Sequence, residues 1–203
     1  MDKNSSDSVK LAVELVEKAQ TIDDSLSGYH TFWGTIYQLQ KQYDKAIVEG
    51  QKAIESAPNN AWDHVHFAQI LFFTGKYNDA ISYAEQATRI SPYHPAWYWN
   101  ILGLCYRHAG RYQEAIDTFG KLLDRAQKGE FPMVTAHGAL ATTYALMGQY
   151  ESARAHFEER KKYDPNPSEW LKNTRKFWSL SEDTEQSHRV LNALQKAGCQ
   201  FLD

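Results

Sequence analysis

One pattern of small and aromatic residues occurs four times along the chain, and this internal repetition limits the folds that it can adopt. The pattern has three recurring positions, a small residue, a tyrosine and an alanine, which fall at Gly34, Ala68, Gly103 and Ala141, at Tyr43, Tyr77, Tyr112 and Tyr150, and at Ala46, Ala80, Ala115 and Ala153. Each series advances by 34, then 35, then 38 residues. A repeat of this length predicts a solenoid, in which small units bury their apolar faces by stacking on one another.

Each repeat has the pattern of two antiparallel helices. In the first copy, the residues of one helical face recur every three or four positions from Trp33 to Gln40, and a second such series runs from Ala46 to Ile54. This spacing places each series on one side of a helix. A short break at residues 41–42 separates the two helices, and Pro58 ends the second one because it cannot continue the helical hydrogen bonding.

The recurring residues resemble those of the tetratricopeptide repeat. In the first copy the resemblance is carried by Trp33, Gly34, Tyr37, Tyr43, Ala46, Ala53 and Pro58. It covers four units from Ser27 to about Pro165. It implies an all-α fold, a right-handed superhelix of antiparallel helix pairs. The expected organisation is an N-terminal half-repeat or capping helix, four repeats of which the third has an extended loop, and C-terminal capping helices, at 1–26, 27–60, 61–95, 96–131, 132–166 and 167–203.

The two ends of the chain depart from the full repeat. Ala12, Val16 and Ala19 fall one period before Ala46, Gly50 and Ala53, so residues 8–22 read as the second helix of a unit whose first helix does not precede it here. Either the half-repeat is a cap or the chain is a piece of a longer protein, and we favour the second explanation. After Pro165, apolar stripes at 170–178 and 190–197 predict two capping helices.

The last residues suggest a parent protein. The segment 188–198, HRVLNALQKAG, resembles the end of the repeat regions at the C-terminus of bacterial class III adenylate or guanylate cyclases and related transcriptional regulators. The resemblance implies that the chain belongs to a larger bacterial regulatory or signalling protein.

Composition excludes several classes of partner. Lys and Arg number 22 against 25 Asp and Glu, a net charge of -3, which gives no electrostatic reason to bind nucleic acid. We expect no membrane insertion of this segment and a cytoplasmic location, because no apolar run is long enough to span a bilayer and residues 1–10 lack the apolar core of a secretory signal. Two cysteines cannot form a disulfide framework, and we expect Cys105 to be a buried free thiol.

No motif indicates catalysis, a metal or a cofactor. His64 and His66 are two positions apart, so on a helix they point in different directions, and no ligand spacing typical of zinc accompanies them. Phosphate-binding loops and nucleophile motifs are also missing from the sequence. We therefore expect a protein that is not an enzyme and that has no catalytic residues, metal ligands or cofactor.

The remaining candidate for function is the surface of the first helices. The resemblance places binding there, on the concave side, and the face not used for packing runs through repeat positions 2, 5, 9, 12 and 13. Large rings and polar groups gather in the second and third repeats, which suits a binding hot spot. The candidate peptide-binding residues are Trp62, His66, Gln69, Phe73, Trp97, Asn100, Arg107 and His108. The alternative is that these rings pack against one another or against the capping helices.

Two functional hypotheses follow. The leading one is a non-catalytic scaffold or adaptor module, which binds a peptide or helix of a partner protein in its concave groove. The alternative is a self-association module, with a homodimer formed through the terminal helices, serving as the regulatory region of a nucleotide cyclase or transcription regulator.

Overall fold

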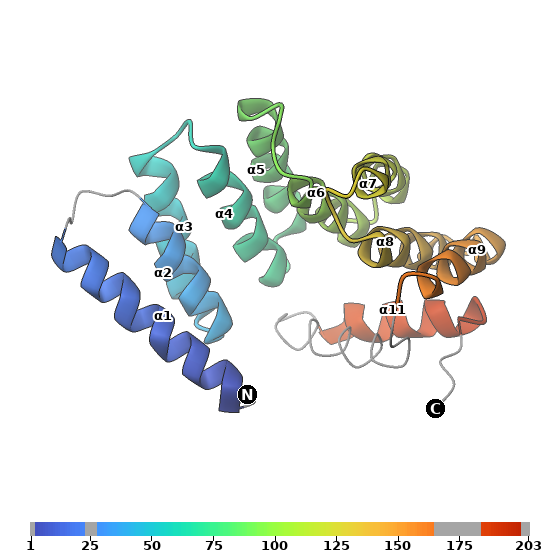
Figure 1. The fold of residues 1–203 in the computed structure, drawn as a ribbon, viewed down its shortest axis with the longest axis horizontal. Helices are drawn as coiled ribbons and strands as arrows, with labels where there is room; N and C mark the ends of the chain where they lie inside the picture. The colour runs from blue at the N-terminus through green and yellow to red at the C-terminus, as the bar shows by residue number, and fades with distance from the viewer. Residues whose placement is uncertain (1–2, 23–27, 165–183, 200–203) are drawn as a thin grey trace. The chain divides into compact units, whose positions relative to one another are not determined.

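The structure, a computed structural model, describes residues 3–22, 28–164 and 184–199, and every regular element in those ranges is an α-helix. This confirms the predicted all-α class. The helices are α1 (Lys3–Ile22), α2 (Gly28–Leu39), α3 (Tyr43–Ser56), α4 (Ala61–Phe73), α5 (Tyr77–Ile90), α6 (Trp97–His108), α7 (Tyr112–Gln127), α8 (Met133–Leu146), α9 (Tyr150–Lys161) and α11 (Thr184–Lys196) (Figure 1). They form two compact units, Met1–Ser91 and Pro92–Asp203, where the repeat pattern predicts one continuous array.

The N-terminal unit contains α1 and two helix pairs. The first helix of each pair packs against its own second helix, α2 on α3 and α4 on α5, and α2 and α4 also pack against each other. The expected small and apolar positions lie in this core. Ala46, Ala53 and Ala80 are buried, and so are Ile36 and Phe67.

The C-terminal unit repeats this arrangement with α6 on α7 and α8 on α9, and adds α11, which packs on α8. The second helices of this unit contribute Phe119 and Leu122 from α7 and Phe157 from α9 to its buried core. The predicted stripe on the last capping helix is buried at Val190 and Leu194, as its apolar spacing requires. The other predicted capping stripe, at 170–178, lies outside the described residues.

Each first helix ends in the same turn. The amide of the residue after the turn donates to a carbonyl five positions back, as Lys76 N does to Leu71 O at 2.9 Å and Gln42 N does to Tyr37 O at 2.8 Å. Such a turn needs one residue with positive φ. Three repeats place glycine there, including Gly75 at φ 75°, whereas the first repeat places Lys41 there at φ 60°.

Replacing Lys41 with glycine should stabilise the N-terminal unit by about 0.5–1 kcal/mol. A side chain in the left-handed region costs roughly 1–2 kcal/mol, and part of this gain is offset by the greater freedom of glycine in the unfolded chain. Urea unfolding measures the effect. Gly75→Ala is the reciprocal control and should destabilise, and a Lys41→Gly variant that is less stable than the wild type would contradict the assignment.

Glycines inside the helices mark the closest helix contacts. A Cβ atom on Gly50 of α3 would lie 2.2 Å from a ring carbon of Phe67 on α4, and one on Gly103 of α6 would lie 2.5 Å from the ring of Phe119 on α7. Both distances are far below van der Waals contact. Gly120 of α7 differs, because a Cβ atom added there would have no neighbouring atom within 4 Å.

This difference predicts opposite effects of the same substitution within one unit. Gly103→Ala should destabilise the fold by about 1–3 kcal/mol, because the buried Phe119 ring must move. Gly120→Ala should stabilise it by about 0.5–1 kcal/mol, because alanine loses less backbone entropy in a helix. Thermal and urea unfolding of the two variants check both signs. Equal effects would show that the close contact at Gly103 is not formed.

Candidate functional site

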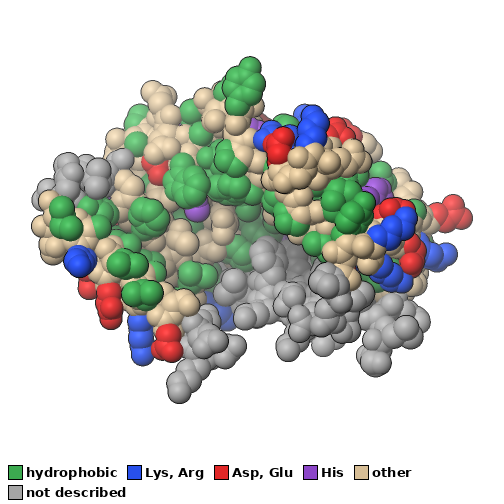
Figure 2. All heavy atoms as spheres, viewed as in Figure 1, with side chains coloured by type: hydrophobic (Ala, Val, Ile, Leu, Met, Phe, Trp, Pro, Cys, Tyr) green, Lys and Arg blue, Asp and Glu red, His purple; other side chains and the backbone are tan. Residues whose placement is uncertain are grey.

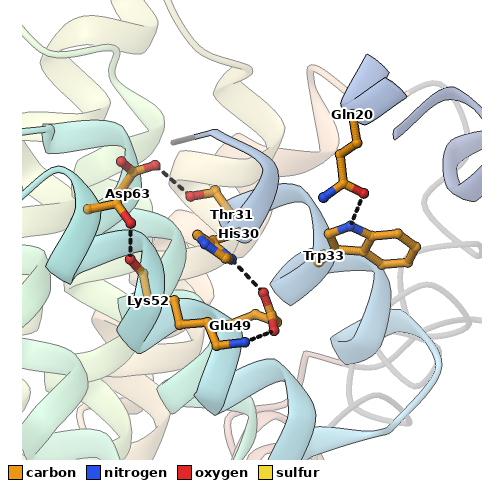
Figure 3. A network of polar contacts seen from close by, with 8 residues as sticks. Gln20, His30, Thr31, Trp33, Glu49, Lys52 and Asp63 are labelled. Atoms are coloured by element: carbon orange, nitrogen blue, oxygen red, sulfur yellow. Dashed lines mark hydrogen bonds and ion pairs between the residues drawn. The ribbon is translucent and has the colours of Figure 1, made fainter. Parts of the chain in front are cut away.

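Polar contacts hold α2 against three neighbouring helices of the N-terminal unit (Figure 3). On the α3 side, His30 Nδ1 lies 2.7 Å from Glu49 Oε2, and Lys52 Nζ donates to the other oxygen of Glu49 at 2.8 Å. On the α1 side, the indole nitrogen of Trp33 donates to Gln20 Oε1 at 3.2 Å. Burial acts to raise the pKa of Glu49, but the hydrogen bonds from Lys52 and His30 outweigh it and the pKa is lowered.

A buried hydrogen bond joins the two first helices α2 and α4. Thr31 Oγ1 donates to Asp63 Oδ1 at 2.5 Å, and both side chains are buried (Figure 3). Burial raises the pKa of Asp63, and the bond from Thr31 opposes this shift. The contact fixes the spacing of α2 and α4 and therefore the position of the side chains on their outer side.

Hydrophobic side chains are exposed on the first helices of this unit. Phe32, Leu39 and Trp62 are 52%, 37% and 43% exposed, and Figure 2 shows hydrophobic side chains gathered on the visible surface of this unit. His66 lies under Trp62, with ring centroids 4.5 Å apart. We define the α2–α4 face as Phe32, Thr35, Leu39, Trp62, His66 and Gln69.

The α2–α4 face occupies repeat positions 2, 6, 9 and 13, whereas the sequence predicted positions 2, 5, 9, 12 and 13. Positions 5 and 12 are buried between neighbouring helices at Thr31, Gln38, Val65 and Phe72. The predicted face was therefore wrong by about 40° of rotation around the helix. Phe73 was expected to meet solvent and is 2% exposed, which corrects that expectation.

Phe32 is the residue that the sequence analysis missed. It lies seven positions before Leu39, so the two side chains share one side of α2. This i, i+7 pair of large apolar residues, which falls outside the packing stripe from Trp33 to Gln40, is the signal that could have identified it.

The candidate residues of the C-terminal unit differ in exposure. Trp97 and Asn100 are half-buried, and they remain predicted contact residues. Arg107 and His108 are buried, contrary to the expected solvent exposure. The guanidinium of Arg107 lies 5.8 Å from the centroid of the Phe119 ring, and burial lowers its pKa to about 10. Burial, with the charge of Arg107, lowers the pKa of His108 to about 3.

Histidine and cysteine side chains are the other groups that could carry chemistry. His137 Nδ1 and His156 Nδ1 of the pair α8 and α9 lie 3.1 Å apart. Within the described ranges, no three His, Cys, Asp or Glu side chains gather as metal ligands. Cys105 is a buried free thiol, as predicted, and burial raises its pKa.

Among the described helices, none combines the length and the apolar character that crossing a membrane requires.

The burial of His66 predicts that the stability of the fold depends on pH. Burial lowers the pKa of His66 from 6.5 to about 4, so its neutral form stabilises the fold above pH 6.5, and this contribution is lost as the pH falls toward 4. His66→Asn should reduce the slope of the unfolding free energy against pH in this window by up to about 1.4 kcal/mol per pH unit. Urea unfolding between pH 4 and 7 measures it. Gln69→Ala controls for local disturbance, and an unchanged slope in His66→Asn would refute the assignment.

Two family models match overlapping parts of the chain. Residues 93–162 match the tetratricopeptide repeat, and residues 39–122 match the anaphase-promoting complex, cyclosome, subunit 3. No curated relative matches significantly. The two family matches support the tetratricopeptide-repeat resemblance seen in the sequence.

Several solved structures share the architecture. The Pseudomonas aeruginosa PilF structure aligns over 96% of this chain and 92% of its own, with 17% identity and a TM-score of 0.65. YrrB, described as a TPR (tetratricopeptide-repeat) protein with an unusual peptide-binding site, aligns over 90% of this chain and 90% of its own, with 16% identity and a TM-score of 0.60. A crystal structure of MamA aligns over 84% of this chain and 99% of its own, with 18% identity and a TM-score of 0.62. The fold is that of tetratricopeptide-repeat proteins. None of these matches bears on the cyclase resemblance of 188–198, which stays a prediction.

Proposed function

We propose that this chain is a non-catalytic protein-interaction module, and that the α2–α4 face binds an extended segment or a helix of a partner protein. The observation that carries the proposal is the exposure of Phe32 and Trp62 on two packed first helices. Large exposed rings on a rigid scaffold are the usual anchors of protein interfaces. The description of YrrB as a peptide-binding TPR protein supports this class of function.

The chemistry of the face favours an apolar or neutral segment of the partner. Phe32, Leu39 and Trp62 supply apolar surface, and His66 is held neutral by burial. Thr35 and Gln69 are half-buried beside these rings and supply hydrogen-bonding groups. None of the six side chains of the face carries a charge at neutral pH, so affinity should depend little on salt.

The rings of the face should carry most of the affinity. Trp62→Ala or Phe32→Ala is expected to weaken binding by about 2 kcal/mol or more, because each removes a large desolvated anchor, while helicity is unchanged. A peptide selected from a displayed library on the wild-type chain serves as the probe, and calorimetry or fluorescence anisotropy gives the dissociation constant. Tyr93→Ala is the control, since Tyr93 is 97% exposed and lies outside the face. An unchanged dissociation constant in both face variants would reject the proposal.

A further inference from the structure

Two histidines face each other where α8 and α9 of the C-terminal unit pack side by side (Figure 1). The Nδ1 atoms of His137 on α8 and His156 on α9 are 3.1 Å apart, and their ring centroids are 5.4 Å apart. The two nitrogens therefore lie between the rings at hydrogen-bonding distance, and the contact requires that one Nδ1 donates while the other accepts. Tyrosine rings stack on both imidazoles, Tyr163 on His137 and Tyr144 on His156.

The same two repeat positions also meet in the first repeat, with different side chains. His137 corresponds by repeat position to His30, and His156 corresponds to Glu49. The Nδ1 atom of His30 lies 2.7 Å from the carboxylate of Glu49, so a proton on that imidazole creates an ion pair. In the fourth repeat, a proton on each imidazole places two like charges 3.1 Å apart, with an N–H donor on both sides. The same helix-to-helix contact therefore responds to protons in opposite ways in the two units.

The surroundings of the histidine pair favour its neutral form. Burial lowers the pKa of His137, and burial together with the charge of His137 lowers the pKa of His156. The charge of Glu159 on α9 opposes both pKa shifts, and the charge of Lys162 adds to the shift of His137. Among the described residues of α6, α7 and α11, the other helices packed on α8, none has a charge that shifts the pKa of either histidine.

These shifts set the direction of the pH effect. Because both folded-state pKa values lie below the ordinary value of 6.5, the neutral pair stabilises the closed contact fully above pH 6.5. That contribution is lost as the pH falls through the lowered pKa values.

We propose that the His137–His156 contact makes the fourth repeat open on acidification, with α9 separating from α8. The first proton leaves the contact intact, because it binds the outer Nε2 of the donating ring and the shared hydrogen bond remains. The second proton occupies the accepting Nδ1, so the hydrogen bond is lost and two charges repel each other. This device goes beyond the proposed function, since neither histidine belongs to the α2–α4 face.

The number of protons makes the opening steep. The open form holds two protons more than the neutral closed form. The opening constant should therefore rise by up to about 100-fold per pH unit, against about 10-fold for a single histidine.

Hydrogen exchange of the α9 amides in the full chain between pH 7 and 4.5, corrected for the intrinsic exchange rate, measures the opening. The protection of α9 in the wild type should fall by more than about tenfold per pH unit over part of this range. The His137→Asn, His156→Asn double variant keeps a polar group at both positions and should lose this fall. His188→Gln is the matched control, because His188 is an exposed histidine of the same unit, and it should behave as the wild type. The same pH dependence in the double variant and the wild type would overturn the proposal.

Two further variants separate the effect of protons from a loss of packing. His156→Glu introduces the side chain that the first repeat has opposite its histidine, so the protection of α9 should be kept or increased as the pH falls from 7 to 5. Glu159→Gln leaves both imidazoles in place and removes a charge that favours their protonation, so opening should shift to lower pH. A His156→Glu chain that opens like the wild type, or an unchanged pH of opening in Glu159→Gln, would contradict the proposal.

Discussion

The structure depends on how closely two helices approach at their small residues. At Gly103 and Gly50 the facing rings, Phe119 and Phe67, occupy the space that a Cβ atom would need. Ala46 on α3 and Ala80 on α5 are fully buried as well. Because this distance is set by the size of a few side chains, it recurs from repeat to repeat while the remaining positions vary. The outer surfaces are therefore free to carry different chemistry on the same scaffold.

This constraint explains why the sequence was sufficient to predict the helix pairs. Residue size at Gly34 or Ala46 is visible in the sequence, and the spacing of three and four residues specifies which side of each helix packs. The division between Ser91 and Pro92 was not predicted, because the repeat pattern describes each helix pair by itself and contains no signal for where one unit ends. The burial of Arg160 is a second feature that the repeat pattern does not specify. The side chain is buried where the repeat expects alanine, and it pairs with Asp164 of the following turn.

The candidate site was predictable only in part, for a geometric reason. The sequence gives the angle of each residue around its helix, but the packing angle of the neighbouring first helix decides which of these residues remain exposed. The Thr31–Asp63 bond shows that position 5 faces the neighbouring helix. Trp62 and His66 remain on the accessible side, whereas Phe73 is buried at the end of α4. A rotation of about 40° therefore separated the expected face from the observed one.

The exposed apolar side chains of the N-terminal unit are of two chemical kinds, and this difference bears on what each surface can bind. On α2 and α4 they are mainly rings, next to hydrogen-bonding groups such as Gln69. Rings have few rotatable bonds and lose little entropy on binding, so they suit a partner segment whose backbone also needs hydrogen bonds. On α1 the exposed apolar side chains, Leu11, Leu15 and Ile22, are aliphatic and follow one side of the helix. The two sets of exposed side chains therefore differ in the chemistry that they offer.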